Sequence, residues 1–191
     1  MPVENNDSFP SVTPSSNTRS KPMDRKRLAV AISQALLLGS MQAQAAEITV
    51  TSNLDDGTGC TLREAITSAN NDNASGNGCV DGNAADTIIF DNSLSGSTIM
   101  LAGSTLDINT DITIDGDNNN DGTADITISA NKASIVFTIV TGSANTVLDG
   151  LTITGGSSAG SGGGLYIKSS SVTLNNCTVT GNTASAIGGG V

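Results

Sequence analysis

Apolar and polar residues alternate in short runs along most of the chain after residue 46. Alternation over about four to eight residues is typical of β-strands that bury one face. Clusters of Gly, Asn and Asp separate the runs, and these residues favour tight turns. The pattern predicts strands at 47–51, 86–90, 97–101, 105–115, 124–130, 133–140 and 146–154.

The last part of the chain repeats itself. The stretch 148–155 aligns with 174–181, and the stretch 162–165 aligns with 188–191 at the same offset (174 − 148 = 188 − 162 = 26). A period of this length marks a solenoid, whose units bury their apolar faces by stacking. The unit contains strands and glycine corners but no helical periodicity, so we predict a right-handed parallel β-helix over 86–191.

One stretch, residues 61–70, has helical instead of strand periodicity. Thr61 and Glu64 have the spacing of a capping box, in which each side chain satisfies a free backbone N–H of the first turn. We expect this helix, within an N-terminal cap at 47–85, to cover the open apolar end of the first coil. A helix that binds a partner is the alternative. The apolar stripe consists of Leu62, Ala65, Ile66 and Ala69.

The N-terminal segment divides into two parts. Residues 1–22 are rich in Pro, Ser and Asn, which predicts a disordered extension or an artefact of start-site choice. Residues 23–46 have a basic region, an apolar region and the small-residue pattern Ala43-Gln44-Ala45, as in a secretory signal peptide cleaved after Ala45 or Ala46. The apolar region is shorter than the ~20 residues of a membrane-spanning helix. We therefore expect an exported mature chain without a transmembrane span.

The chain after residue 46 is strongly acidic. It contains three basic residues against fifteen acidic ones, a net charge of −12. Phosphate groups would be repelled, which argues against nucleic acid and anionic membranes as partners. Divalent cations or uncharged partners fit this charge better.

The three cysteines fall into two groups. Cys60 and Cys79 bracket the predicted helix, and export would bring them to an oxidising compartment, so we predict a disulfide. In the chain-entropy model it contributes about 3 kcal/mol. Zinc binding is the alternative, but two thiols in a chain without histidine fall short of a four-ligand site. Cys177 aligns with Leu151 in the repeat, so we expect a buried structural thiol.

An acidic loop at 115–125 offers oxygen ligands at alternate positions. From Asp117 on it resembles a D-x-[DN]-x-[DN]-G calcium loop, but Ile128 stands where a bidentate Glu is expected, and no helix flanks the loop. The sequence leaves two interpretations open: weak calcium binding that stiffens the loop, or a plain Asn/Asp/Gly turn. The candidate calcium ligands are Asp115, Asp117, Asn119, Asp121 and Asp125.

Two motifs resemble known families. The run at 60–66 (CTLREAI), followed by Ala69-Asn70, Cys79 and the run at 86–90 (DTIIF), resembles the N-terminal CSLREA-type domain of bacterial secreted β-helix proteins, with Thr61 where Ser is usual. The run at 176–182 and the following glycines are similar to repeats of polymorphic outer membrane proteins. The chain has GGGL and GGGV where those repeats have GGA[ILV], and the FxxN motif would carry Cys and Thr in place of Phe and Asn.

This resemblance implies a secreted or surface-displayed passenger, often one that ends in an autotransporter barrel or another anchor. The chain stops at Val191 in mid-coil, so we expect the 86–191 stack to be truncated there. The implied function is that of a non-catalytic, adhesin-like or structural module of an outer-membrane or autotransporter-type protein. Its partner would be a host or neighbouring cell surface, or another copy of the chain.

The main alternative is a polysaccharide lyase or hydrolase, because many parallel β-helices cleave acidic polysaccharides. The chain has no His and no Arg after position 63, and only Lys132 and Lys168 remain to bind a polyanion. Tyr166 is the only residue suited to stack on a sugar, and Asp149 stands alone in its predicted strand. We therefore expect no enzyme activity, and a calcium-stabilised spacer is the further alternative.

Overall fold

The computed structural model describes residues 44–76, 78–140 and 145–191. Parallel strands in this part of the chain stack as a β-solenoid of about four turns with one α-helix, which confirms the predicted right-handed parallel β-helix. Residues 42–191 form one compact unit with its own core. The expected extension at 1–22 and all but the last three residues of the expected signal peptide lie outside the described residues.

The described elements follow one another in short segments. The helices are α2 (Leu62–Asn71) and the 3-10 helix η1 (Asn92–Leu94). The strands are β1 (Glu47–Val50), β2 (Asp86–Phe90), β3 (Thr98–Met100), β4 (Leu106–Ile108), β5 (Ile112–Asp115), β6 (Ile126–Ser129), β7 (Phe137–Ile139), β8 (Asn145–Asp149), β9 (Leu151–Thr154), β10 (Ser157–Ser158), β11 (Leu165–Ile167), β12 (Ser171–Asn175), β13 (Thr178–Thr180) and β14 (Thr183–Ala184). Among the described helices none combines the length and the apolar character that a bilayer crossing requires.

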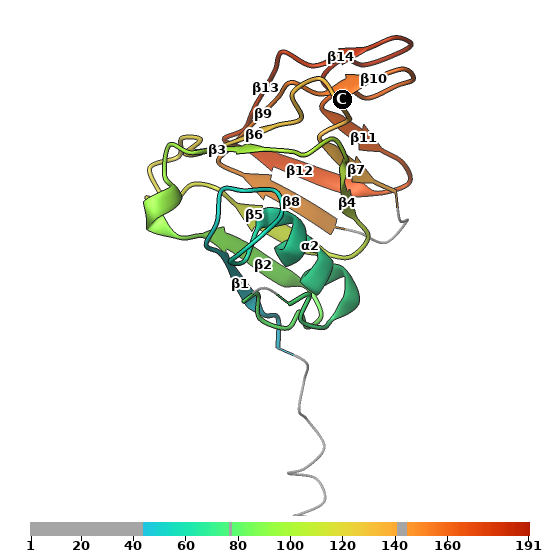
Figure 1. Cartoon of the computed structure of the whole chain (residues 1–191). Coiled ribbons are helices and arrows are strands. Elements are labelled where there is room, and N and C mark those ends of the chain that lie inside the picture. The colour runs from blue at the N-terminus through green and yellow to red at the C-terminus, as the bar shows by residue number, and fades with distance from the viewer. Residues whose placement is uncertain (1–43, 77, 141–144) are drawn as a thin grey trace, which may run out of the picture. The chain divides into compact units, whose positions relative to one another are not determined.

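Strands from successive coils pair in parallel and form the walls of the solenoid (Figure 1). Sheet A has the order β1-β2-β5-β8-β12, sheet B the order β3-β6-β9-β13, and sheet C the order β4-β7-β11. The short strands β10 and β14 form a fourth pair. Each strand of these three sheets thus pairs with strands of adjacent coils.

The strand register confirms the repeat in the last coils. Ser171 pairs with Asn145 and Thr178 pairs with Thr152, both at the offset that the sequence repeat predicts. Earlier coils vary in length because the corners carry loops of different size. Thr146 pairs with Ile112, a larger offset (146 − 112 = 34), and this longer coil contains the acidic loop.

Inward side chains stack in columns that form the core. In sheet B, Ile99, Ile128 and Ile153 occupy paired positions in successive coils, and each is at most 1% exposed. On the outer face of the same strands, threonines stack in place of isoleucines. This outer threonine ladder consists of Thr98, Thr127, Thr152 and Thr178. The period-2 alternation therefore produces an apolar interior and a hydroxyl-lined exterior.

Two predicted strands are wrong in extent. The run 105–115 divides into β4 and β5, and the run 146–154 divides into β8 and β9. The chain turns between β8 and β9 at Gly150, whose φ of 59° is left-handed, and a Cβ there would lie 2.4 Å from the backbone nitrogen of Asp117. Alternation continues through the corner between β4 and β5, because the inward residues stay at even positions from Leu106 to Ile114, so the pattern alone does not place that corner. At Gly150 the inward positions instead shift by one, from Leu148 in β8 to Leu151 in β9.

Helix α2 forms where the sequence predicts it, with Thr61 as its N-cap. The Glu64 backbone N–H donates to Thr61 Oγ1 at 3.3 Å, and the Thr61 backbone N–H donates to Glu64 Oε2 at 3.1 Å, which confirms the capping box. The helix contacts β1, β2 and β4 and covers the first coil (Figure 1). Its buried face is made by Leu62, Ala65, Ile66, Ser68 and Ala69.

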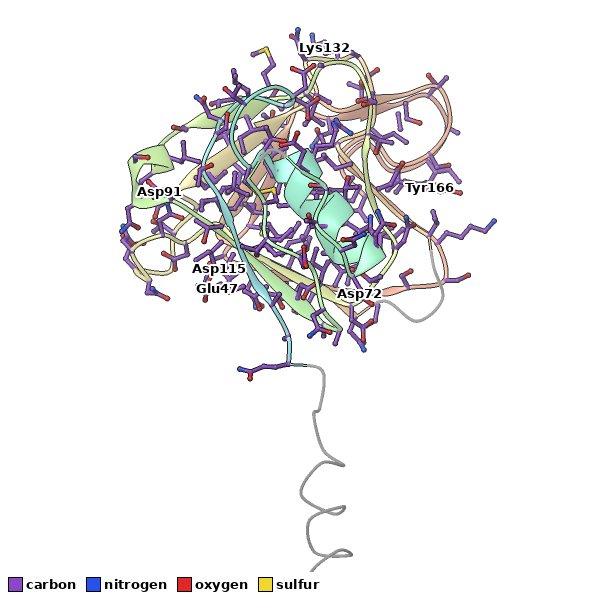
Figure 2. All side chains as sticks on the ribbon, turned by 60° about the horizontal axis from the view of Figure 1, so that its bottom comes forward. Glu47, Asp72, Asp91, Asp115, Lys132 and Tyr166 are labelled. Atoms are coloured by element: carbon purple, nitrogen blue, oxygen red, sulfur yellow. A yellow bond between two sulfur atoms is a disulfide. The ribbon has the colours of Figure 1, made fainter. Side chains whose placement is uncertain are left out.

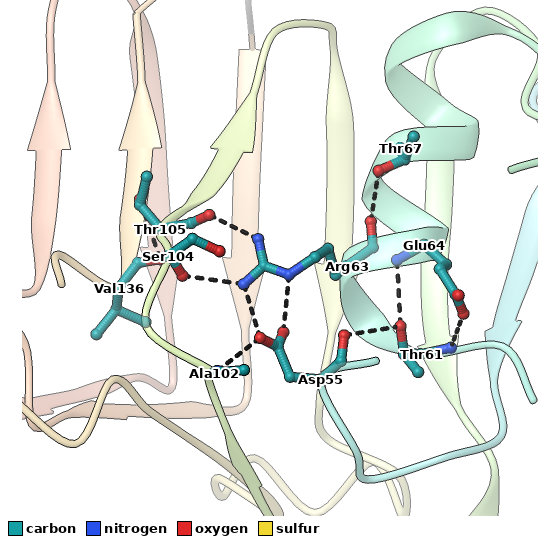
Figure 3. A network of polar contacts seen from close by, with 9 residues as sticks. All are labelled: Asp55, Thr61, Arg63, Glu64, Thr67, Ala102, Ser104, Thr105 and Val136. Atoms are coloured by element: carbon teal, nitrogen blue, oxygen red, sulfur yellow. Dashed lines mark hydrogen bonds and ion pairs between the residues drawn. The ribbon is translucent and has the colours of Figure 1, made fainter. Parts of the chain in front are cut away.

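Polar side chains of the cap occupy the free edges of the first coil (Figure 3). Arg63 forms an ion pair with Asp55 at 2.9 Å and donates from Nη1 to the carbonyl of Thr105 at 2.8 Å. Asp55, which is 6% exposed, also accepts the backbone N–H of Ala102 at 2.7 Å. One buried carboxylate and one guanidinium thus bond backbone groups beside β3 and β4 that have no strand partner on this side.

Asn70 bonds backbone groups without a strand partner at the other end of β4. Its Nδ2 donates to the carbonyl of Asp107 at 2.7 Å, and its Oδ1 accepts the backbone N–H of Asn109 at 2.8 Å. The helix therefore replaces a missing strand along the edge of sheet C. An edge occupied in this way is closed to pairing with another chain.

The predicted disulfide between Cys60 and Cys79 is confirmed. The two cysteines lie 19 residues apart in sequence and 4.7 Å apart between Cα atoms, and both are buried. The bond ties the start of α2 to the segment that leads into β2. Because it closes a loop around the helix, it limits the conformations of the cap in the unfolded chain.

Substitution of one column residue tests the stacked core. Ile128→Ala should lower the free energy of unfolding by about 2–5 kcal/mol, because it leaves a cavity between two coils. The neighbouring Thr127→Ala, on the outer face, should lower it by less than about 1 kcal/mol. Urea unfolding followed by circular dichroism measures both. Equal losses for the two variants would contradict the assigned register.

Candidate functional site

The acidic loop between β5 and β6 is closed by its own hydrogen bonds. Asp117, which is 9% exposed, accepts the backbone N–H of Asp121 on Oδ1 at 3.0 Å and that of Gly122 on Oδ2 at 2.8 Å. Asp115 Oδ1 in turn accepts the backbone N–H of Asp117 at 3.0 Å. These carboxylates therefore serve as acceptors for the turn, as Asx side chains commonly do.

The remaining candidate calcium ligands follow the same pattern. Asn119 Oδ1 accepts the backbone N–H of Asp121, and Asp121 Oδ1 accepts both the backbone N–H and the hydroxyl of Thr123. The hydroxyl hydrogen bond holds the pKa of Asp121 below its ordinary value. Asp125 Oδ2 is buried without a hydrogen-bond partner. Within the described ranges, no three His, Cys, Asp or Glu residues gather closely enough to hold a metal ion.

The loop geometry has the hydrogen bonds of an Asn/Asp/Gly turn. The carboxylates already accept backbone N–H groups of the same loop, as the turn interpretation expects, although each oxygen keeps a further lone pair. Calcium binding by Asp115, Asp117, Asn119, Asp121 and Asp125 stays a prediction.

Two carboxylates from different coils stack on the outer face of sheet A. Asp115 of β5 pairs with Asp149 of β8, so Asp149 does not stand alone as the sequence suggested. Adjacent strands lie about 4.8 Å apart, and paired positions point to the same face. Asn175 continues the row in β12, and Asn176 Nδ2 donates to Asp149 Oδ1 at 3.0 Å. The two aspartates are far apart in sequence, and only the register reveals that they are neighbours.

A shallow hollow of about 160 Å³ lies beside Asp115 of this pair. The hollow offers acceptor oxygens and the apolar end of strand β2, which suits a hydroxylated or hydrated ligand of modest size. Lys132 and Tyr166 are well separated from Asp115 (Figure 2). The hollow is lined by Ile89, Phe90, Asn92, Asp115, Asp117, Asn118 and Asn120.

Cys177 is less buried than the repeat suggested. It takes the position of Leu151 in the next coil, as the pairing of Thr178 with Thr152 requires, but it is only half-buried. The last coil has no described coil stacked on its far side, which explains the exposure. Burial raises the pKa of the Cys177 thiol, and the nearby charge of Asp149 raises it further. Both effects weaken this thiol as a nucleophile at neutral pH.

Comparison of the chain with protein-family models, with curated proteins and with solved structures gives no match.

The acidic loop can be tested by removing its central acceptor. Asp117→Ala should lower the free energy of unfolding by about 1–3 kcal/mol, because the backbone N–H of Gly122 loses its acceptor and that of Asp121 keeps only Asn119 Oδ1. The control Asn119→Ala removes one exposed acceptor and should have a smaller effect. If the loop is a plain turn, millimolar calcium leaves the melting temperature of the unaltered protein unchanged. A rise with calcium that Asp117→Ala abolishes would contradict the turn interpretation.

Proposed function

We propose that this protein is a secreted or cell-surface β-helix module that acts without catalysis, as a structural or adhesin-like passenger of an outer-membrane or autotransporter-type protein. The observation that carries the proposal is the regular hydroxyl-lined exterior of the coils. The outer threonine ladder repeats the same hydroxyl at each coil, about every 4.8 Å. A stiff surface with evenly spaced hydroxyls suits binding by shape and hydrogen bonding.

The disulfide supports a location outside the cytoplasm. Disulfides persist in oxidising compartments and are rare where thiols are kept reduced. Cys60 and Cys79 are joined in the folded chain, and the segment before residue 46 has the pattern of an export signal. The CSLREA-like sequence around the same helix agrees with this location.

The charge of the module narrows the kind of partner. An acidic surface repels nucleic acid and anionic lipid, whereas neutral glycans or hydroxylated protein surfaces meet no such barrier. The outer ladder offers donors and acceptors to such partners. A host or neighbouring cell surface, or another copy of the module, is the partner class we propose.

Export and oxidation can be measured together. The full chain produced in a bacterial host should lose its N-terminal segment and appear outside the cytoplasm with Cys60 and Cys79 oxidised, as judged by fractionation and thiol-labelling mass spectrometry. Variant Cys60→Ser should be destabilised by about 2–5 kcal/mol. Cys177→Ser is the matched control and should leave export and oxidation unchanged. Retention of a full-length, reduced chain in the cytoplasm would contradict the proposal.

A second candidate function is glycan hydrolysis, and one observation favours it. Retaining glycosidases place two carboxyl groups about 5 Å apart, which is close to the strand spacing that separates Asp115 from Asp149. However, Asp115 accepts the backbone N–H of Asp117, and Asp149 accepts Nδ2 of Asn176. Both carboxyl groups thus bond donors of their own corner and of the next coil, a structural role that ranks hydrolysis second.

Polysaccharide turnover distinguishes the two functions. Incubation of the exported protein with neutral and acidic polysaccharides should release no new reducing ends and no unsaturated sugars. Asp149→Asn should then behave like the unaltered protein in the same assay. Product formation that Asp149→Asn abolishes, and that Asp107→Asn on another face retains, would establish the hydrolase instead.

A further inference from the structure

A carboxylate lies inside the first coil, where the core is otherwise apolar or neutral. Asp86 is the first residue of β2 and is 1% exposed. It pairs with Ile112, which in turn pairs with Thr146, so it stands in an inward column of sheet A. A charge in such a place is costly unless it is paired and hydrogen-bonded.

The hydrogen bonds of Asp86 satisfy only one of its two oxygens. Oδ1 accepts the backbone N–H of Ala46 at 2.9 Å and that of Asn83 at 2.8 Å. Oδ2 is buried and has no hydrogen-bond partner. Gly82 packs tightly against α2 here, since a Cβ on it would lie 2.8 Å from Asp86 Oδ2 and 2.3 Å from the carbonyl oxygen of Ser68. The pocket around Asp86 Oδ2 is therefore closed on the side of helix α2.

Among the described residues, no cationic side chain neutralises this carboxylate. The one ion pair in that part of the chain joins Arg63 to Asp55. The nearest donor that processing could turn into a cation is the nitrogen of Ala46, which already lies at hydrogen-bond distance.

The sequence before Ala46 is the cleavage pattern Ala43-Gln44-Ala45. Hydrolysis of the bond between Ala45 and Ala46 consumes one water, leaves a carboxylate on Ala45 and gives Ala46 a free α-amino group that takes up a proton. Ala45 is exposed and Ala46 is half-buried, so the bond itself lies at the surface of the folded unit. An ammonium at this nitrogen has three N–H donors in place of one.

We propose that export processing cuts after Ala45 and that the new α-ammonium of Ala46 forms a buried ion pair with Asp86. This inference rests on the proposed secretion of the chain. The ammonium keeps the bond to Oδ1 and supplies a donor for Oδ2, which completes the pocket. Removal of the signal peptide thereby stabilises the first coil, and the uncut precursor lacks this contribution.

The alternative cut after Ala46 would remove two hydrogen bonds around Asp86 and the start of β2. It would remove the donor to Asp86 Oδ1, and it would also remove the Ala46 carbonyl, which accepts the backbone N–H of Thr87 at 2.9 Å. Asp86 would then be buried with only Asn83 as a donor. The contacts thus distinguish the two cleavage sites that the sequence left open.

The first test is the mass and N-terminal sequence of the exported protein. The proposal requires Ala46 as the first residue, and Glu47 as the first residue would overturn it. A chain that is neither exported nor cut would overturn the proposed secretion, and the second test then decides on the ion pair alone.

The second test compares four chains, each released from a fusion by a protease. Two begin at Ala46 and two begin at Gln44, and in each pair one chain keeps Asp86 and the other carries Asp86→Asn. With Asp86 intact, the chain that begins at Ala46 should have an unfolding equilibrium constant lower by at least about tenfold, as expected for a charge-assisted bond in a buried site. In the Asp86→Asn background this difference should shrink to less than about twofold. An equal difference in both backgrounds, or none in either, would overturn the ion pair. Asp81→Asn, at an exposed position, is the matched control for loss of one negative charge.

Discussion

The stacking of like residues in successive coils is the interaction on which the rest of this structure depends. Parallel backbone pairing sets adjacent strands about 4.8 Å apart and places equivalent side chains directly above one another. An inward isoleucine such as Ile128 is buried because Ile99 and Ile153 lie on either side of it. No coil can bury its own apolar face, so the two ends of the stack need another element to cover their apolar layer and bond their free backbone groups.

At the N-terminal end this covering and bonding come from one short segment. Helix α2 covers the apolar layer, the disulfide holds the helix in place, and the side chains of Arg63 and Asn70 bond the backbone along the edge of β4. The last described coil shows what stacking contributes when a neighbour is missing. Leu174 is 39% exposed, whereas Leu148, its partner in the preceding coil, is fully buried. The same reasoning explains why Cys177 is only half-buried.

The sequence predicts what depends on local pattern and misses what depends on register. The helix, its capping box and the disulfide follow from spacing around Thr61. The stacking of Asp115 on Asp149 does not, because coil length varies with the size of the corner loops. The contact between Ala46 and Asp86 is missed for the same reason, since the whole cap segment separates them in sequence. The corner between β4 and β5 is missed because apolar alternation continues through it, whereas at Gly150 the shift of inward positions from Leu148 to Leu151 is a signal that the sequence does carry.

Residue-level hydrogen exchange of the folded chain tests the central claim, that each coil is stabilised by its neighbours and the stack is anchored at the capped end. The account predicts that the backbone amides of β2, β5, β6 and β8 exchange slowest and that protection falls through β9 to β12 and β13. Equal protection of β12 and β5 would contradict it, as would a helix α2 that exchanges freely while the first coil stays protected.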